Sequence, residues 1–273
     1  DRQAVRCLDQ RQSQVLCDIE ILERDLDLGG VARDLGIAEF QVGDLVVLPV
    51  DIGVEIAPAD LTVGPHWNGW GVDASQRRFQ PADQARLAAD QVPRLKLAWA
   101  FGFPGATRAY SQPTIRVGRL GGGSATGKVY ALDAKTGCTW WAFDAGAPVR
   151  TAISIGKSGG RWTAYFGDQH GYAFAVDALS GKYLWETRVD DHPAAAVTGA
   201  PTLAGDVLYV PVTSYEEISA GDPAYACCSF RGGVVALEAA TGRVLWHGYT
   251  SPQAPRPVGR NSAGVQLLGP SGA

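Results

Sequence analysis

The sequence predicts an all-β protein, most of which forms a partial β-propeller of about three four-stranded blades. Three observations predict this fold. One residue pattern recurs three times, apolar residues alternate with polar ones in the segments around it, and the chain contains 34 glycines and 16 prolines. Many short strands joined by turns are typical of propellers, sandwiches and barrels, and they disfavour an all-helical fold.

The repeat occupies three segments of equal length. Each begins with glycine, places Asp or Glu six residues later, continues with Ser/Thr-Gly and ends on tryptophan eight residues after the acidic residue. The copies run from Gly127 to Trp141, from Gly171 to Trp185 and from Gly232 to Trp246. Trp99 precedes Trp141 by 42 residues, and the next two intervals are 44 and 61 residues. This spacing indicates a blade period with an insertion of about seventeen to nineteen residues in the third copy.

Each copy predicts a β-hairpin. The first strand ends at the acidic residue, whose carboxylate can accept backbone hydrogen bonds within the turn. The glycine supplies a positive φ, and the returning strand carries the tryptophan into the packing between sheets.

Further strands are expected upstream of each hairpin, because four strands make a propeller blade. Only one is clear for the first copy, whereas two can be identified for each of the others. The expected strands are 110–115 for the first copy, 149–155 and 163–166 for the second, and 197–203 and 207–212 for the third. A β-sandwich with coincidental turns is the alternative.

Residues 1–65 differ in composition from residues 66–273. The first segment contains thirteen acidic and five basic residues, a net charge of −8, whereas the rest contains fifteen acidic and nineteen basic residues, a net charge of +4. Phe40 is the only aromatic residue of the first segment. We therefore predict a boundary near Pro65. The first segment is either a small accessory domain or a stretch translated from a frame that encodes no native fold.

Charge and hydropathy exclude several partners. The net charge is −4 and Lys and Arg do not cluster, so no nucleic-acid partner is predicted. No run of eighteen or more apolar residues occurs, so no membrane span is predicted. A Cys-x-x-Cys-His signature is absent, so haem c is not predicted. The chain has no methionine, and three blades are too few to close a ring, for which about four are needed; we therefore expect a fragment of a longer protein.

Residues 66–273 resemble a known family. The pattern Val/Leu-Asp-Ala-x-Thr-Gly-x-x-x-Trp is similar to the repeat of quinoprotein propellers, whose larger members bind pyrroloquinoline quinone (PQQ) on the ring axis. Longer segments together resemble the polyvinyl alcohol dehydrogenase family. These segments are HWNGWG at 66–71, LKLAWAFGFPG at 95–105, VRTAISIG at 149–156, CCSFRG at 227–232 and NSAGVQ at 261–266. The resemblance implies a fragment of a propeller with seven to eight blades, and residues 1–65 do not contribute to it.

The resemblance assigns a role to two adjacent cysteines in the insertion of the third copy. In quinoprotein alcohol dehydrogenases, a disulfide between neighbouring cysteines lies flat against PQQ, and an arginine shortly after it hydrogen-bonds the quinone oxygens. Carried over to this chain, Cys227 and Cys228 would form the disulfide and Arg231 would polarise the reactive carbonyl. In methanol-oxidising relatives this arginine lies slightly further along. Two buried reduced thiols are the alternative, because bonds between adjacent cysteines are rare.

Arg150 and Thr198 are two further candidate cofactor-binding residues. Arg150 stands at the start of an expected inner strand, where side chains point toward the propeller axis, and a surface ion pair is its alternative. Thr198 stands where some relatives place a cofactor-binding glutamate, which is a departure from the family pattern. Cys138 is expected to be a structural thiol and Asp168 to cap a turn.

The resemblance implies a periplasmic enzyme that oxidises secondary alcohols such as polyvinyl alcohol and passes electrons to a cytochrome c. A disulfide also fits the periplasm. Calcium as a Lewis acid and an aspartate as general base are expected on later blades of the full-length enzyme. No catalytic residue or metal ligand is therefore assigned within this chain, and the isolated chain is expected to be inactive.

Two other functions stay open. One is a non-catalytic propeller that serves as a scaffold for protein–protein interaction, and the other is a truncated gene product without activity. The adjacent cysteines and Arg231 favour the enzyme over the scaffold, because a scaffold has no use for them.

Overall fold

The computed structural model describes residues 64–73, 75–116 and 118–269, which fold mainly into antiparallel sheets. The predicted segment 1–65 falls almost wholly outside these ranges, so its boundary stays a prediction. Helices in the described ranges are short: α2 (Ala82–Ala85), the 3-10 helix η1 (Ala89–Arg94) and α3 (Glu216–Ser219). Within the same ranges no helix has the length and hydropathy needed to cross a membrane.

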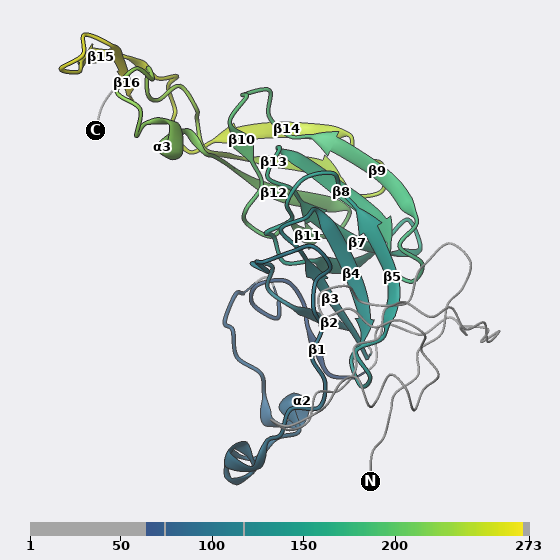
Figure 1. Cartoon of the computed structure of the whole chain (residues 1–273). Helices are drawn as coiled ribbons and strands as arrows, with labels where there is room; N and C mark the ends of the chain where they lie inside the picture. Colours follow the sequence, from purple (N-terminus) through teal and green to yellow (C-terminus); the bar gives the residue numbers. More distant parts are fainter. Residues whose placement is uncertain (1–63, 74, 117, 270–273) are drawn as a thin grey trace, which may run out of the picture.

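Three sheets carry the three copies of the repeat, and Figure 1 shows them side by side in chain order. The first consists of β1 (His66–Trp67), β2 (Thr114–Arg116), β3 (Arg119–Gly123), β4 (Lys128–Asp133) and β5 (Thr139–Asp144). The second consists of β6 (Ser154–Ser158), β7 (Arg161–Gly167), β8 (Tyr172–Asp177) and β9 (Tyr183–Arg188). The third consists of β10 (Ala195–Ala196), β11 (Thr202–Ala204), β12 (Val207–Ser214), β13 (Gly233–Glu238) and β14 (Val244–Tyr249).

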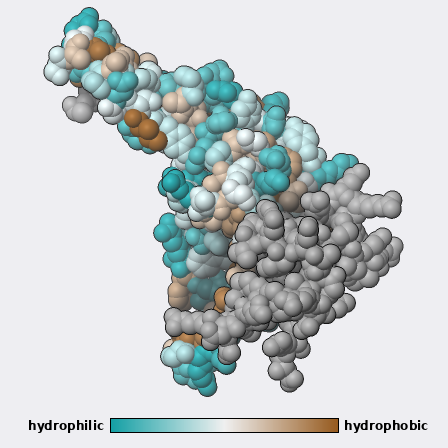
Figure 2. Space-filling model, in the orientation of Figure 1, coloured by the Kyte–Doolittle hydropathy of each residue, from teal (hydrophilic) through white to brown (hydrophobic). Residues whose placement is uncertain are grey.

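A separate two-stranded sheet follows the third sheet. It is the antiparallel hairpin of β15 (Arg256–Arg260) and β16 (Gln266–Gly269). In Figure 1 this hairpin extends beyond the third sheet, on the same side as α3. On the face shown in Figure 2, hydrophobic residues form small separate patches, one of them near α3.

Side chains of the innermost strands bind the backbone of the next sheet. Thr114 of β2 donates its hydroxyl to the carbonyl of Ile153, and Ser154 of β6 donates its hydroxyl to the carbonyl of Pro201. Strand β6 also contacts β11 directly. Consecutive sheets are therefore joined at their inner edges, as expected of blades arranged around an axis. The predicted partial propeller is confirmed.

The segment that includes β1 fastens the first sheet to the second. Strand β1 pairs with β2. The next residue, Asn68, donates its amide N–H to the carbonyl of Ile155 at 2.9 Å and accepts the backbone N–H of Ile155 at 2.8 Å. An asparagine suits this position of the HWNGWG segment because its side-chain amide can both donate to and accept from the backbone of one residue.

The hydrophobic core lies between the sheets. Apolar residues of β4, β5, β7 and β8 fill the space between the first and second sheets, among them Val129, Trp141, Phe166 and Val176. Those of β7, β9, β12 and β13 fill the space between the second and third, among them Tyr165, Trp185, Leu208 and Val235. Full burial of one such side chain stabilises the fold by about 1.5–3 kcal/mol. The packing of one sheet on the next is thus a major source of stability.

The acidic residue accepts backbone N–H groups of the turn in the first two hairpins, as predicted, whereas Glu238 of the third accepts the Thr241 hydroxyl and a guanidinium N–H of Arg243. In the first copy, Oδ1 of Asp133 accepts the backbone N–H groups of Lys135 and Thr136 at 3.0 and 2.9 Å. Asp177 does the same in the second copy. The glycine that ends each turn has a positive φ, which costs a residue with a side chain about 1–2 kcal/mol. These glycines are Gly137, Gly181 and Gly242, with φ of 76°, 71° and 75°.

Trp99 and the tryptophans of the first two copies dock on the turn of the following sheet, whereas Trp246 of the third copy is 47% exposed and does not pack between two described sheets, contrary to the prediction. The indole N–H donates to the carbonyl of the alanine that follows the acidic residue: Trp99 to Ala134 at 3.2 Å, Trp141 to Ala178 at 3.2 Å and Trp185 to Ala239 at 3.1 Å. A Cβ atom added to the turn glycine would lie 2.8, 2.7 and 2.6 Å from these three indoles in turn. Glycine is therefore required at this position for two reasons: the backbone has a positive φ, and the indole ring leaves no room for a Cβ atom.

Three predicted strands begin later than expected. The expected strand 110–115 starts only at Thr114, the expected strand 149–155 at Ser154, and the expected strand 197–203 at Thr202. In the last two cases the preceding residues are bound to the previous sheet: the N–H of Val149 donates to the carbonyl of Ser124 at 3.0 Å, and that of Val197 to the carbonyl of Asp168 at 2.8 Å. These apolar residues are buried in the connection between two sheets. They therefore do not form strand pairs within either sheet.

Candidate cofactor site around the Cys227–Cys228 disulfide

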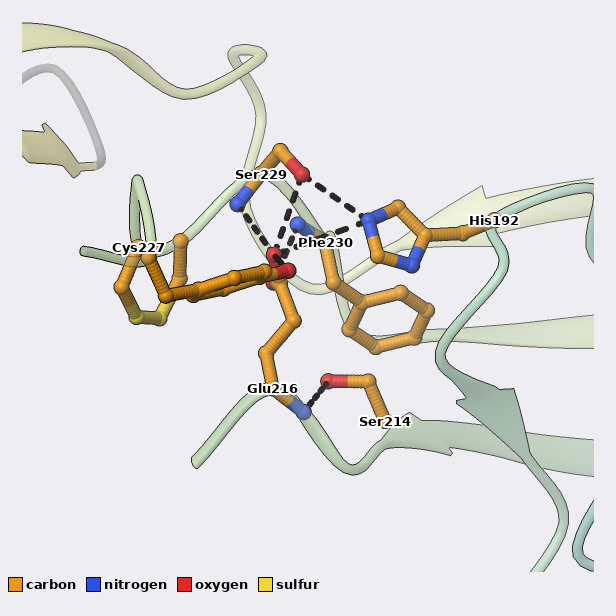
Figure 3. Close-up of a disulfide and its surroundings, with 8 residues drawn as sticks. His192, Ser214, Glu216, Cys227, Ser229 and Phe230 are labelled. Carbon is orange, nitrogen blue, oxygen red and sulfur yellow. Dashed lines mark hydrogen bonds and ion pairs between the residues drawn. A yellow bond between two sulfur atoms is a disulfide. The ribbon is translucent and has the colours of Figure 1, made fainter. Parts of the chain in front are cut away.

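The candidate site lies in the insertion between β12 and β13, residues 215–232. Cys227 and Cys228 are joined by a disulfide and their Cα atoms are 3.0 Å apart. The predicted bond is confirmed, and the alternative of two reduced thiols is not what the structure shows. Both cysteines are half-buried, so part of the disulfide is accessible. Figure 3 shows the disulfide at the left and Glu216 at the centre, with its carboxylate pointing toward Ser229 and Phe230.

The backbone of the disulfide pairs with the C-terminal hairpin. The N–H of Cys228 donates to the carbonyl of Leu268 at 3.1 Å, and the N–H of Leu268 donates to the carbonyl of Cys227 at 2.7 Å. On the preceding side, the N–H of Cys227 donates to the carbonyl of Tyr225 at 3.0 Å. The two cysteines are therefore held between the insertion and β16.

Glu216, the first residue of α3, is 2% exposed. Its Oε1 accepts the hydroxyl of Tyr225 at 2.9 Å and the backbone N–H and hydroxyl of Ser229 at 2.8 and 3.0 Å. Its Oε2 accepts the backbone N–H of Phe230 at 2.6 Å. Burial raises the pKa of Glu216, but these hydrogen bonds outweigh burial and lower it below its usual value. The carboxylate is thus ionised and fully hydrogen-bonded.

His192, from the connection between β9 and β10, completes this cluster. The N–H of Ala194 donates to Nδ1 of His192 at 3.1 Å, so Nδ1 is unprotonated and Nε2 carries the hydrogen in the neutral ring. Nε2 lies 2.9 Å from the hydroxyl of Ser229 and 3.6 Å from Oε1 of Glu216. The hydrogen bonds therefore run from His192 to Ser229 and from Ser229 to Glu216, as Figure 3 shows.

Arg231 lies at the end of the insertion, and its guanidinium faces β14 and the residues after it. One terminal nitrogen donates to the carbonyl of Ser251, and Cζ lies 3.8 Å from the centre of the Tyr249 ring. Its Nε–H is buried and has no hydrogen-bond partner among the described residues. Within those residues it makes no hydrogen bond to the two cysteines, so its predicted contact with a quinone stays a prediction.

Arg150 and Thr198 occupy different surroundings. Arg150 is exposed, and its Cζ lies 5.5 Å from the centre of the Tyr110 ring. It also lies close to the hydroxyl of Tyr215: burial raises the pKa of that group, and the charge of Arg150 opposes the rise. Because Tyr215 precedes Glu216, Arg150 adjoins the disulfide-bearing insertion. Thr198 is half-buried between β10 and β11 and makes no side-chain hydrogen bond to the described residues.

Glu216, His192 and Ser229 were not predicted as site residues. The insertion contains three carboxylates, Glu216, Glu217 and Asp222, and sequence spacing does not distinguish the buried one. Ser229 follows the cysteine pair directly, which is the one local signal that could have drawn attention to it. His192 lies outside the insertion, so only the packing of β10 against β12 reveals its role.

Two other expectations concern cysteine and metal chemistry. Cys138 is disulfide-bonded, so the expectation of a structural thiol there is wrong. Across the ranges that the structure describes, no three His, Cys, Asp or Glu side chains gather into a group that could hold a metal ion.

Comparison with known proteins agrees with the arrangement of the sheets. The PQQ_2 family model, described as outer membrane protein assembly factor BamB, matches residues 67–260. Polyvinylalcohol dehydrogenases of a Pseudomonas species and of Sphingopyxis sp. (strain 113P3) are 41% and 43% identical over 222 and 219 residues. These alignments cover 80% and 79% of this chain, which spans only 34% and 33% of the relatives' own length.

A solved structure shows the same fold. The crystal structure of a quinohemoprotein alcohol dehydrogenase from Comamonas testosteroni superposes with a TM-score of 0.56 at 23% identity. The match covers 68% of this chain and 27% of that enzyme. The described sheets therefore have the arrangement found in part of a larger propeller.

Proposed function

This chain belongs to the PQQ_2 family of repeat proteins, and on that premise we propose that it is part of a PQQ-dependent alcohol dehydrogenase that oxidises secondary alcohols such as polyvinyl alcohol. The disulfide between Cys227 and Cys228 carries the proposal. It lies in an insertion that the first two sheets lack, so blade packing does not require it. Its half-buried position suits a planar ligand that stacks on the two sulfurs.

The residues present fit a quinone in a second respect. Arg231 follows the disulfide by three residues and keeps one buried N–H without a partner among the described residues. A quinone oxygen accepts such a charge-assisted hydrogen bond well. When bound, PQQ would accept a hydride from the alcohol carbon. The residues of this chain would bind and orient the ring, with Arg150 and Thr198 as further candidates for contact.

Location, metal and electron acceptor are parts of the same proposal. A disulfide persists in oxidising compartments, which supports the periplasm. Calcium and the general base are proposed for the parts of the enzyme outside this chain. A cytochrome c as electron acceptor follows from the family resemblance, and haem c itself has no attachment motif in this sequence.

A protein-binding scaffold is the second candidate. The family description names an outer membrane assembly factor, and the three repeats themselves are accounted for by sheet packing. The insertion distinguishes the two candidates, because protein binding gives no reason for a disulfide between adjacent residues.

Titration with PQQ under non-reducing conditions tests the enzyme proposal. The non-reduced chain should bind PQQ saturably, as measured by quenching of tryptophan fluorescence. Replacing both cysteines of the pair, Cys227→Ser with Cys228→Ser, should weaken binding by about tenfold or more, which is about 1.4 kcal/mol. Cys138→Ser is the control for the loss of a disulfide elsewhere in the chain, because Cys138 is itself disulfide-bonded and lies in the turn between β4 and β5, outside the insertion.

The proposal fails if the chain binds no PQQ although peptide mapping across residues 226–231 finds the disulfide intact. It also fails if the double variant binds PQQ as tightly as the wild type. Alcohol-dependent dye reduction by the isolated chain, with PQQ and calcium added, is expected to be absent because the chain spans about a third of its relatives' length.

A further inference from the structure

We propose that Glu216 is the positioning residue that fixes the Cys227–Cys228 disulfide in the orientation a stacked cofactor requires. The cofactor in this statement rests on the proposed function, whereas the anchoring of the loop does not. Glu216 touches neither sulfur through a hydrogen bond. It acts through the residues on both sides of the pair.

The donors to Glu216 bracket the disulfide in sequence. Tyr225 lies two residues before Cys227, and Ser229 and Phe230 directly follow Cys228. Four hydrogen bonds from these three residues end on one carboxylate, at 2.6 to 3.0 Å. Both ends of the segment that contains the two cysteines are therefore tied to the same buried group.

Burial makes these hydrogen bonds costly to lose. Glu216 is 2% exposed, so water cannot replace a missing donor without a movement of the loop. A buried carboxylate left unpaired is costly, and hydrogen bonds to a charged group are roughly twice as strong as neutral ones. The loop is thus held more firmly by Glu216 than by its exposed turns.

The cluster has no arrangement suited to chemistry of its own. Ser229 donates to Glu216 and lies within hydrogen-bond distance of Nε2 of His192, which carries the hydrogen of the neutral ring, so the imidazole does not act as the base for this hydroxyl. All four donors already occupy the carboxylate of Glu216, and its pKa is lowered, which makes it a poor general base. Anchoring is the role that these contacts support.

His192 extends the anchor to another strand. It lies on the chain that enters β10, and the N–H of Tyr215 donates to the carbonyl of Ala194 in the same connection at 3.0 Å. The disulfide loop, α3 and the inner edge of the third sheet are therefore one hydrogen-bonded unit. The orientation of the disulfide is set relative to the edge that faces the propeller axis.

Glu216→Gln is the direct test, with Glu217→Gln as the matched control. The variant has nearly the same shape, but it places an NH₂ donor against either a backbone N–H or the Ser229 and Tyr225 donors. Amide hydrogen exchange should become at least tenfold faster across residues 225–230 and stay within about twofold in β12 and β13. Glu217 is exposed in the same helix, so its variant should exchange like the wild type.

Cofactor affinity gives the readout that distinguishes positioning from general stability. The dissociation constant for PQQ should rise at least about tenfold in Glu216→Gln and stay unchanged in Glu217→Gln. Tyr225→Phe removes one donor and leaves the carboxylate in place, so it should accelerate exchange at residues 226–230 by a smaller factor. Tyr225→Phe therefore provides the test of anchoring if Glu216→Gln does not fold.

The outcomes separate this inference from the proposed function. Unchanged exchange at residues 225–230 in Glu216→Gln, or in Tyr225→Phe where the former does not fold, overturns the anchoring. Faster exchange with unchanged PQQ affinity overturns the positioning role. If the wild-type chain binds no PQQ while exchange responds as expected, the proposed function fails and the cofactor part of this inference fails with it; the anchoring is upheld.

Discussion

Glu216 and Asp168 are two buried carboxylates whose pKa values move in opposite directions. Hydrogen bonds from Ser229, Phe230 and Tyr225 outweigh burial at Glu216 and lower its pKa. At Asp168, 2% exposed, burial outweighs the N–H groups of Tyr172 and His170, at 2.8 and 3.0 Å, and raises the pKa. The balance between desolvation and hydrogen bonding therefore decides the charge of each group. Asp168 caps its turn as predicted.

Asp168→Asn should change how stability depends on pH. The raised pKa means that the folded chain binds the proton of Asp168 more tightly than the unfolded chain does. The stability from this group is therefore full below the ordinary pKa, 3.8, and is lost as pH rises through the raised value. An amide oxygen still accepts the two N–H groups but does not titrate. Urea unfolding at several pH values should show that the free energy of unfolding of the variant increases relative to that of the wild type as pH rises.

Glu216→Gln should show the opposite pH dependence of stability in the same urea-unfolding experiment. The pKa of Glu216 is lowered in the folded chain, so its stability is present above the ordinary value of 4.5 and is lost as pH falls through the lowered one. The wild type should therefore lose its advantage over this variant on acidification. A difference that does not vary with pH in either variant would contradict these assignments.

At the scale of one hairpin, the turn glycine meets two requirements that substitution can separate. Gly181 has φ of 71° and an added Cβ would lie 2.7 Å from the Trp141 indole, whereas Gly146 has φ of 76° and open space around it. Gly146→Ala should cost about 1–2 kcal/mol from backbone conformation alone. Gly181→Ala should cost about 1–3 kcal/mol more, from overpacking. Equal losses in urea unfolding would show that the indole moves aside freely.

The hairpins could be predicted because their determinants are local. The acidic residue, the glycine and the tryptophan of each copy lie within about fifteen residues, and in the first two copies each does in the structure what its type suggests. In the third copy Trp246 is exposed, and Glu238 accepts side-chain donors in place of backbone N–H groups. Strand β3 was missed because it contains Gly121, Gly122 and Gly123, which are poor strand formers. Its glycines reflect close packing: a Cβ on Gly123 would lie 2.5 Å from the Val149 side chain.

The disulfide could be inferred from a family resemblance, but its anchor could not. Glu216 and Glu217 are adjacent and identical in type, and only the path of the loop buries one and exposes the other. His192 reaches the loop from 37 residues away in sequence. Contacts of this kind depend on tertiary packing, which a pattern of spacing does not contain.

For the molecule as a whole, the three docking tryptophans define an interface that is used between consecutive sheets. Trp141 and Trp185 are 4% and 7% exposed because the next sheet covers them. Trp246 occupies the equivalent position on β14 and is 47% exposed, with Val244 and Tyr249 of the same strand also exposed. Among the described residues, no turn covers this face of the third sheet. The tryptophan at this position therefore contributes more to the free energy of unfolding in the first two sheets than in the third.

This difference predicts unequal effects of one substitution. Trp185→Ala removes a buried indole and its hydrogen bond to Ala239, and should destabilise the chain by about 3–5 kcal/mol. Trp246→Ala removes a half-exposed ring whose centroid lies 6.0 Å from that of Tyr209, and should cost less than half as much. Urea unfolding of both variants, followed by circular dichroism, gives the comparison. Equal losses would mean that the Trp246 face is covered in solution, and a concentration-dependent unfolding midpoint would then identify a second copy of the chain as the cover.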